Sequence, residues 1–178
     1  MPDIPDIHVR TARLSEAATI LKLVHESMSH YCKDSGIPDS YIEATSESLQ
    51  IVEDAISSGV VFVALNDEDD ILGTCRLYIR PRREMGRELS GVEGKISSRI
   101  AYFARFAVWD TWRSLGIGNY LLSHCESFAR STSCSHMLLH TALSNKGMVA
   151  YYEAHGFKLL SSDQSRGYDR GLFAKRLK

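Results

Sequence analysis

The chain has 178 residues, of which 44% are hydrophobic and 24% charged, and its formal net charge at pH 7 is -1. These values are ordinary for a globular protein, and the length predicts one domain over residues 1–178. The near-zero charge argues against a nucleic-acid partner. The lack of a secretory signal and of any apolar run of about 20 residues argues against a membrane partner, so we expect a cytoplasmic protein.

The four cysteines give no sign of a metal site. They are widely spaced, without a Cys-x-x-Cys pair or a His spacing typical of zinc: Cys32, Cys75, Cys125 and Cys134. We expect reduced thiols that are mostly buried, and no metal.

The N-terminal segment predicts a strand followed by a helix. Ile7–Ala12 has strand character, and Ser15 is a candidate N-cap, with Glu16 in the first turn where a carboxylate favours the helix dipole. Apolar residues then recur at helical spacing on one face: Ala17, Leu21, Val24 and Met28.

A second helix and a hairpin follow. The helix is predicted over Thr45–Ser57, ending at Gly59. VVFVAL from Val60 and ILGTCRLYI from Ile71 are rich in branched and aromatic residues and are joined by an acidic turn, which predicts a β-hairpin. The polar segment Pro81–Ser98 is longer than a usual hairpin loop and is either a working flap or a slack surface loop.

The second half predicts a strand from Ile100, a glycine-containing turn and a helix. That helix has an apolar face made of Ile117, Leu121, Leu122, Cys125 and Phe128. A strand from His136, a short helix ended by Gly156 and two closing strands complete the chain: Phe157–Ser161 and Gly171–Arg176. The fold class is therefore α/β, with a mainly antiparallel central sheet, one βαβ crossover and flanking helices.

The turn WRSLGIGNYLL, Trp112–Leu122, is a candidate phosphate site. A helix start leaves backbone N–H groups without partners, and glycine lets an anion approach them. The chain has no G-x-x-x-x-G-K-[ST] motif, and Leu121 stands where G-x-G-x-x-G needs its third glycine, which argues against ATP and NAD loops. The alternative is a tight turn whose glycines only permit close packing.

Two signatures resemble the GNAT superfamily of N-acetyltransferases. FAVWDTWRSLGIG matches a hydrophobic strand followed by [RQ]-x-x-G-x-[GA], with Arg113, Gly116 and Gly118 in register. NKGMVAYYEAHGF matches the second signature through Asn145, Tyr152, Gly156 and Phe157. The resemblance implies the GNAT fold and binding of acetyl-CoA as cosubstrate.

The resemblance also implies roles for individual residues. The pyrophosphate would lie on the backbone amides of the turn, with a charged contact from Arg113: Ser114, Leu115, Gly116, Ile117, Gly118 and Asn119. Pantetheine and the thioester carbonyl would be held by the backbone of Phe106, Ala107 and Val108. Asn145 would bond the cofactor arm, cap the last helix, or both. Tyr152 would be the general acid for the CoA sulfur, the alternative being a core aromatic.

The general base is not evident. An alkyl amine is only about one part in 2,500 unprotonated at pH 7, so the acceptor must lose a proton before it attacks. Many relatives have a Glu on the strand before the turn, where this chain has Ala104. His140 is the base candidate on the next strand. Other candidates are read first as solvated residues: Glu84, Glu88, Glu93, His25, Glu26 and His30.

The sequence therefore predicts an N-acetyltransferase that moves acetyl from CoA to a primary amine of a small molecule or peptide, by direct attack in a ternary complex. The alternative is a non-catalytic acyl-CoA-binding regulatory module, which the missing carboxylate at Ala104 keeps open. Four arginines could hold an acidic acceptor: Arg80, Arg82, Arg83 and Arg87. The acceptor itself is not fixed, and a homodimer is left open.

Overall fold

The computed structural model describes residues 6–177, which form a seven-stranded sheet with flanking helices. The strands are β1 (His8–Thr11), β2 (Val61–Leu65), β3 (Ile71–Pro81), β4 (Arg99–Val108), β5 (His136–Ala142), β6 (Lys158–Asp163) and β7 (Arg170–Arg176). The helices are α1 (Ala17–Ser35), α2 (Leu49–Ser57), α3 (Arg82–Met85), α4 (Ile117–Ser131) and α5 (Lys146–Ala154). The spatial order is β1-β2-β3-β4-β5-β7-β6.

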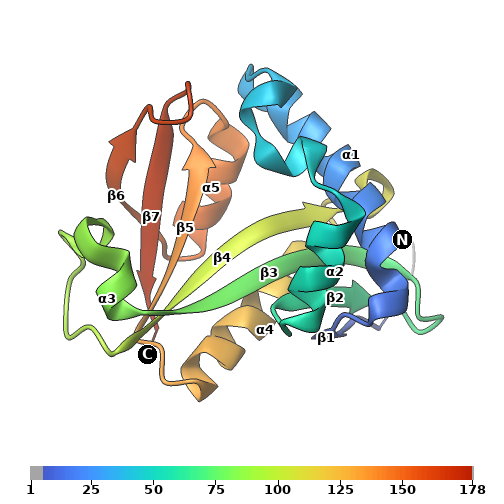
Figure 1. Cartoon of the computed structure of the whole chain (residues 1–178), viewed down its shortest axis with the longest axis horizontal. Helices are drawn as coiled ribbons and strands as arrows, with labels where there is room; N and C mark the ends of the chain where they lie inside the picture. The colour runs from blue at the N-terminus through green and yellow to red at the C-terminus, as the bar shows by residue number, and fades with distance from the viewer. Residues whose placement is uncertain (1–5, 178) are drawn as a thin grey trace.

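Every neighbouring strand pair is antiparallel except β4 and β5, which are parallel and joined through α4. The predicted fold class, mainly antiparallel with one crossover, is confirmed. Helices α1 and α2 pack on one face of the sheet through residues such as Leu23, Val52 and Val63. Helix α4 lies on the other face of the sheet (Figure 1). Its Ile117 and Leu121 pack there, and Tyr152 of α5 joins the same cluster.

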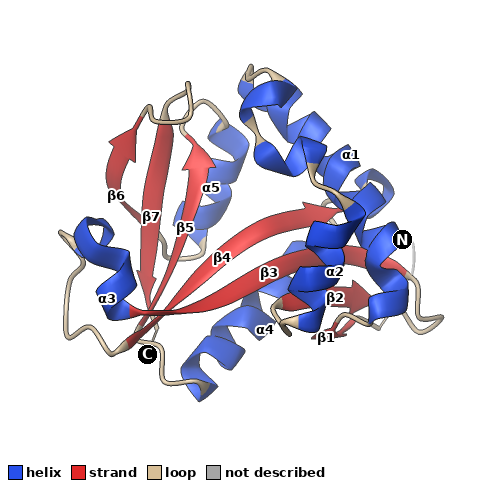
Figure 2. Cartoon of the chain, viewed as in Figure 1, coloured by secondary structure: helices blue, strands red, loops and turns tan. Residues whose placement is uncertain are grey.

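Strands β4 and β5 separate soon after they meet. They are paired only at Ala101 with Met137 and at Tyr102 with Leu138, and Figure 2 shows them diverging beyond that point. On its other side β4 has a bulge, because its register with β3 shifts between Ala104 and Ala107. Arg105, inside the bulge, has a φ of 53°, a conformation that costs a non-glycine residue free energy. The result is a wedge-shaped opening in the sheet, bordered by a bulged strand.

Several predicted boundaries were wrong for identifiable reasons. Ser15 does not cap a helix but lies within a 3₁₀ turn, Leu14–Glu16, where the Glu16 carboxylate accepts from the Arg13 amide at 2.7 Å. The second helix begins at Leu49 rather than Thr45, and Ser48 is its N-cap. Phe128 of α4 is 36% exposed and covers Phe62 from outside the core.

The segment between β3 and β4 is partly ordered as α3 and a 3₁₀ turn, Gly86–Leu89, and it buries Met85 and Leu89. All four cysteines are free and buried, as predicted. No helix within residues 6–177 is long and apolar enough to cross a membrane, and the same residues form no group of three or more His, Cys, Asp or Glu side chains able to hold a metal.

Candidate functional site

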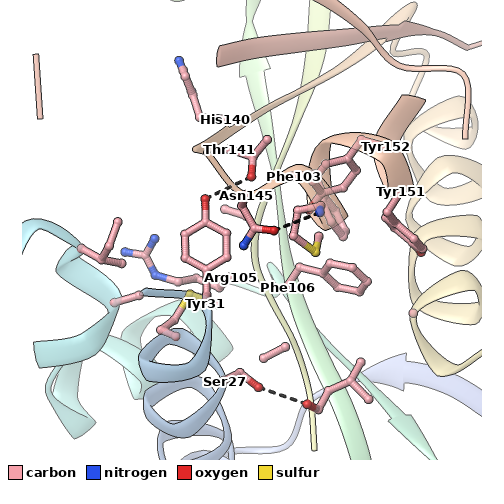
Figure 3. A pocket seen from close by; sticks show the side chains of 18 of the residues that line it. Ser27, Tyr31, Phe103, Arg105, Phe106, His140, Thr141, Asn145, Tyr151 and Tyr152 are labelled. Carbon is pink, nitrogen blue, oxygen red and sulfur yellow. Dashed lines mark hydrogen bonds between the residues drawn. The ribbon is translucent and has the colours of Figure 1, made fainter. Parts of the chain in front are cut away.

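A cavity of about 970 Å³ follows the wedge between β4 and β5. Its walls come from α1, the two diverging strands, the turn before α4, and α5 (Figure 3). The predicted site residues that line it are Phe106, Ala107, Val108, Arg113, Ser114, Gly116, Ile117, Gly118, Asn119, His140, Asn145 and Tyr152. Leu115 does not line the cavity. Residues of β4 and β5 that are far apart in the sequence, such as Ala104 and Thr141, therefore line the same cavity.

The glycine turn presents a row of free backbone amides. Ser114 and Gly116 have φ values of 63° and 84°, and Gly116 is the N-cap of α4. The amides from Ser114 to Gly118 donate to no acceptor within residues 6–177. The amide of Asn119 differs from its prediction, because it donates to the Gly116 carbonyl at 2.9 Å. Five amides at a helix N-terminus remain able to bind an anion.

The two motif glycines serve different purposes. A Cβ atom on Gly116 would meet nothing within 4 Å, whereas one on Gly118 would lie 2.7 Å from Cζ of Phe106 and 3.2 Å from the Tyr151 hydroxyl. Gly118 is therefore required for close packing, which is the alternative that the sequence left open for this turn. Gly116 adjoins open space and has the positive φ that glycine adopts at little cost.

Arg113 lies at the same end of the cavity in a small charged cluster. Its guanidinium is 2.9 Å from Asp110, and His30 is 3.4 Å from the same carboxylate. The Arg113 side chain is exposed, so it can turn toward a bound anion without desolvating a buried group. His30, a base candidate from the sequence, is thus placed beside Arg113 and does not line the cavity.

The bulge of β4 is held by a buried ion triad that the sequence did not reveal. Glu47, 5% exposed, accepts two hydrogen bonds from Arg76, at 3.0 and 2.6 Å, and one from Nε of Arg105 at 3.1 Å. Its backbone carbonyl is 2.8 Å from Nε2 of His25. Glu47 therefore connects β3 and the strained residue of the bulge through its carboxylate, and α1 through its backbone carbonyl. No spacing rule links Glu47 to Arg76 or Arg105, which lie 29 and 58 residues away.

Beyond Tyr102, the edge of β4 that faces β5 has no strand partner among the described residues. Phe106, Ala107 and Val108 lie on this edge, and Ser27 of α1 fixes the Val108 carbonyl with a 3.1 Å hydrogen bond. An extended ligand could add to this edge as a further strand, which is a common way for a backbone to bind a linear molecule.

Tyr152 and Asn145 occupy the α5 wall. Tyr152 is 5% exposed, and burial raises the pKa of its hydroxyl well above the usual value, with a further contribution from Tyr31. It therefore stays protonated at neutral pH, and its hydroxyl bonds to no group in residues 6–177. Asn145 caps α5, accepting from the Met148 amide at 3.1 Å, and donates to Ser35 Oγ at 3.1 Å. Its amide group is thus used structurally while the residue lines the cavity.

Two tyrosines have roles that the sequence did not indicate. The Tyr31 hydroxyl is 3.0 Å from Thr141 Oγ1 and accepts from the Ala142 amide at 2.6 Å, so α1 is tied to the free end of β5 (Figure 3). Tyr151 also lines the cavity and donates to the Asn119 side chain at 3.0 Å. Its hydroxyl lies at the glycine turn, and its ring stacks on Phe106 with 5.8 Å between the ring centroids.

His140 is paired with Tyr102, with 2.8 Å between Nδ1 and the tyrosine hydroxyl. Burial, followed by the nearby Arg170, lowers the pKa of His140 to about 4. The imidazole is therefore neutral at pH 7 and accepts or donates a hydrogen bond, but a group of such low pKa takes a proton from an amine inefficiently.

We expect the His140 imidazole to titrate near pH 4 in the folded protein, measured by NMR of its ring protons with His140→Gln for assignment. Because this pKa lies below the ordinary 6.5, the unfolded chain takes up the proton first. The contribution of His140 to stability is present above about pH 6.5 and is lost as the pH falls towards 4. A midpoint at pH 6 or above would contradict this environment.

The other base candidates do not line the cavity. Glu84, Glu88, Glu93 and Glu26 are exposed, and His25 contacts the Glu47 backbone. The acidic residues that do line the cavity are Asp34, exposed near the end of α1, and Glu43, which pairs with Arg166. Ala104 lines it as well, so the position where many relatives have Glu offers no carboxylate.

Comparisons with known proteins agree on one family. The sequence model of the acetyltransferase (GNAT) family matches residues 25–157. A GNAT acetyltransferase from Streptococcus agalactiae superposes with a TM-score of 0.77 at 16% identity, over 97% of this chain and 96% of that one. PaiA N-acetyltransferase from Thermoplasma acidophilum, solved with coenzyme A, gives 0.74 at 19% identity, over 96% and 99%.

A plant structure has a similar score. NAA60 of Arabidopsis thaliana, solved with a bisubstrate analogue, gives a TM-score of 0.75 at 14% identity, over 96% of this chain and 98% of that one. At these identities the three structures show a shared fold that extends over nearly the whole chain.

Proposed function

Because the chain belongs to the acetyltransferase (GNAT) family, we propose that it transfers an acetyl group from acetyl-CoA to a primary amine of a small molecule or peptide. The amine attacks the thioester directly in a ternary complex. The observation that carries the proposal is the continuity of one cavity, which joins the glycine turn to the unpaired edge of β4; four of the five free amides of the turn belong to residues that line it. Both features fit a diphosphate followed by an extended arm.

The cosubstrate would lie along the wedge. Its diphosphate would accept from the amides of Ser114 to Gly118, and Arg113 would add a charged contact. The pantetheine arm would pair with the edge of β4 from Phe106 to Val108, opposite Asn145 on α5. The open space beside Gly116, which a side chain would occupy, supports this placement.

The proposed reaction has two steps. The amine nitrogen forms a bond to the thioester carbonyl carbon, and the oxygen becomes an oxyanion near the backbone amides of Phe106 to Val108. Collapse of the tetrahedral intermediate then breaks the carbon–sulfur bond, and the CoA sulfur takes the proton of the Tyr152 hydroxyl. The proton that the amine nitrogen loses passes through water and restores the Tyr152 hydroxyl. The high pKa of Tyr152 keeps this proton in place beforehand.

The amine proton leaves through water in this proposal. His140 is the base candidate on β5, but a group with a pKa of about 4 is better suited to orienting the amine than to removing its proton. Amines of lower pKa would react faster, since an α-amino group of pKa about 7.7 to 8.0 is far more often neutral at pH 7 than a lysine side chain.

Release of free CoA thiol with a panel of amines tests the activity. The proposal requires amine-dependent thiol release and an acetylated product by mass spectrometry. Binding of acetyl-CoA without transfer to any amine would instead support the acyl-CoA-binding module, the alternative from the sequence.

We also propose that residues 1–178 act as one domain in the cytoplasm and need no metal. A single sheet that runs from β1 to β7 supports the first statement. Four free thiols suit a reducing compartment.

Replacing Gly116 with glutamate should weaken CoA binding by at least about tenfold, because the carboxylate would project into the open space beside the phosphate amides. Isothermal titration calorimetry measures the affinity. The matched control is Gly59→Glu, since Gly59 also has a positive φ, 71°, and open space around it but does not line the cavity. Equal CoA affinity in the two variants would refute the proposed phosphate site.

A further inference from the structure

One part of the cavity wall is rich in arginine side chains, on the sheet face that carries α1. Tyr78 of β3 and Tyr102 of β4 are opposite each other in the register, and Tyr102 contacts His140 of β5. Three arginines surround this group and all line the cavity: Arg105, Arg166 and Arg170. We call them the arginine cluster. They come from the β4 bulge, the β6–β7 connection and the start of β7.

Two members of the cluster have unused hydrogen-bond donors. Arg105 donates to Glu47 through Nε, and Arg170 donates to both oxygens of Asp163 through Nε, at 3.1 Å each. In residues 6–177 the terminal nitrogens of these two guanidiniums have no acceptor. Each side chain is thus fixed through Nε while its outer N–H groups remain available, a suitable arrangement for a carboxylate or phosphate.

Three carboxylates pair directly with the cluster and with the buried Arg76. Glu43 pairs with Arg166 and Asp163 with Arg170, but Glu47 is shared between Arg105 and the buried Arg76. Four guanidiniums therefore face three carboxylates.

Other charged groups adjoin the cluster. Asp34 of α1 lines the cavity, and the charge of Glu88 raises the pKa of Tyr102. The guanidinium carbon of Arg80 lies 5.2 Å from the centre of the Tyr78 ring. Arg80 has no carboxylate partner among the described residues. With these groups included, five guanidiniums and five carboxylates lie in this region, so what distinguishes it is the unused outer N–H groups of Arg105 and Arg170 rather than a net charge.

The pKa shifts of His140 and Tyr102 both include effects of the arginine cluster. Burial and then Arg170 and Arg166 lower the pKa of His140, against one opposing effect from Asp163. At Tyr102, burial raises the pKa, while Arg170, Arg105 and Arg166 all act to lower it against Glu88. Arginines from three segments therefore influence the pKa values of this one Tyr102–His140 pair.

We propose that the acceptor amine carries an anionic group, a carboxylate or a phosphate, which binds the outer N–H groups of Arg105 and Arg170. This inference rests on the proposed function and names its substrate class. A cationic polyamine or an unmodified basic peptide would place its second charge against the cluster and bind poorly. Of the arginines that the sequence offered for an acidic acceptor, only Arg80 lines the cavity, whereas Arg82, Arg83 and Arg87 do not.

Matched acceptors test the proposal. Leucine, phenylalanine and β-alanine are each compared with their carboxamides, and O-phosphoethanolamine with ethanolamine to separate phosphate from carboxylate. We expect kcat/KM to favour an anionic acceptor over its neutral partner by at least about tenfold. The amine of an amino-acid carboxamide is less basic than the amine of the amino acid itself, so a larger fraction of it is neutral at pH 7. Amine basicity alone would therefore make the neutral carboxamide the faster acceptor.

Variants locate the binding site. Arg170→Gln should remove most of this preference by raising KM for the anionic acceptor, and should change KM for the neutral partner by less than about twofold. Arg130→Gln is the control, since Arg130 also pairs with a carboxylate, Glu126, but does not line the cavity. A preference that survives Arg170→Gln, or equal rates for anionic and neutral acceptors, would overturn the inference and leave the proposed activity standing.

A second measurement decides the matter even if no acceptor is turned over. Succinate and succinamide, which have no amine, are titrated into the CoA-bound protein while the Nε–H NMR signals of Arg105 and Arg170 are followed. Succinate should shift both signals to saturation and succinamide should not. Equal shifts, or no shift with succinate, would contradict the anion site, whereas absent thiol release with a positive titration would contradict the transfer reaction alone.

Discussion

Glu47→Gln should lower the free energy of unfolding by about 3–5 kcal/mol, one of the two largest effects expected in this protein. Removing one partner of a buried ion pair leaves the other charge uncompensated in a medium of low dielectric. Here the loss affects two guanidiniums, because Arg76 and Arg105 share the Glu47 carboxylate, and the Arg76 side chain is only 3% exposed. Urea unfolding at pH 7 measures the change.

The control is Glu43→Gln, which removes the carboxylate of an exposed pair with Arg166. Exposed ion pairs contribute about 0–1 kcal/mol, so this variant should be nearly as stable as the parent. A cost below about 1 kcal/mol for Glu47→Gln would show that the triad does not hold the β4 bulge.

Tyr152→Phe should lower kcat by about 10²-fold with little change in KM for acetyl-CoA. Proton transfer by a positioned side chain typically contributes 10² to 10⁴-fold, and a thiol of pKa near 8.5 is already a tolerable leaving group, so the lower end is expected. The substitution removes only the hydroxyl, which has no hydrogen-bond partner in the described residues, so folding should be unaffected. Initial rates with a saturating acceptor measure the effect.

Tyr151→Phe is the matched control on the next residue of α5. Its hydroxyl contacts the Asn119 side chain at the glycine turn, so its loss should act on KM for acetyl-CoA and leave kcat within about threefold. Equal kcat in Tyr152→Phe and the parent enzyme would mean that the proton comes from another group.

Much of the fold could be predicted from the sequence because its signals are local. Alternating and branched residues predicted the hairpin of β2 and β3, and helical spacing predicted α1 and α4. The start of the second helix was predicted wrongly because a long-range contact decides the local structure there. Glu47 is extended, and α2 starts after it, where its carboxylate reaches Arg76 and Arg105. Such a long-range contact leaves no periodic pattern in the sequence from which it could be predicted.

Residues of the candidate site could be predicted from the sequence only where they belong to one of the two motifs. The glycine turn and Asn145, which the motifs single out, line one cavity, and their backbone geometry requires particular residue types. Tyr31 could not be found in this way, because it reaches Thr141 across 110 residues of sequence. The division of labour between Gly116 and Gly118 was equally hidden, since it depends on where the Phe106 ring lies.

A crystal structure of the chain with coenzyme A tests the central claim most directly. We expect the diphosphate oxygens within about 3 Å of the amides of Ser114 to Gly118, and the pantetheine arm along β4 beyond Tyr102. A diphosphate bound elsewhere, or a wedge between β4 and β5 that closes on protein side chains, would contradict the account.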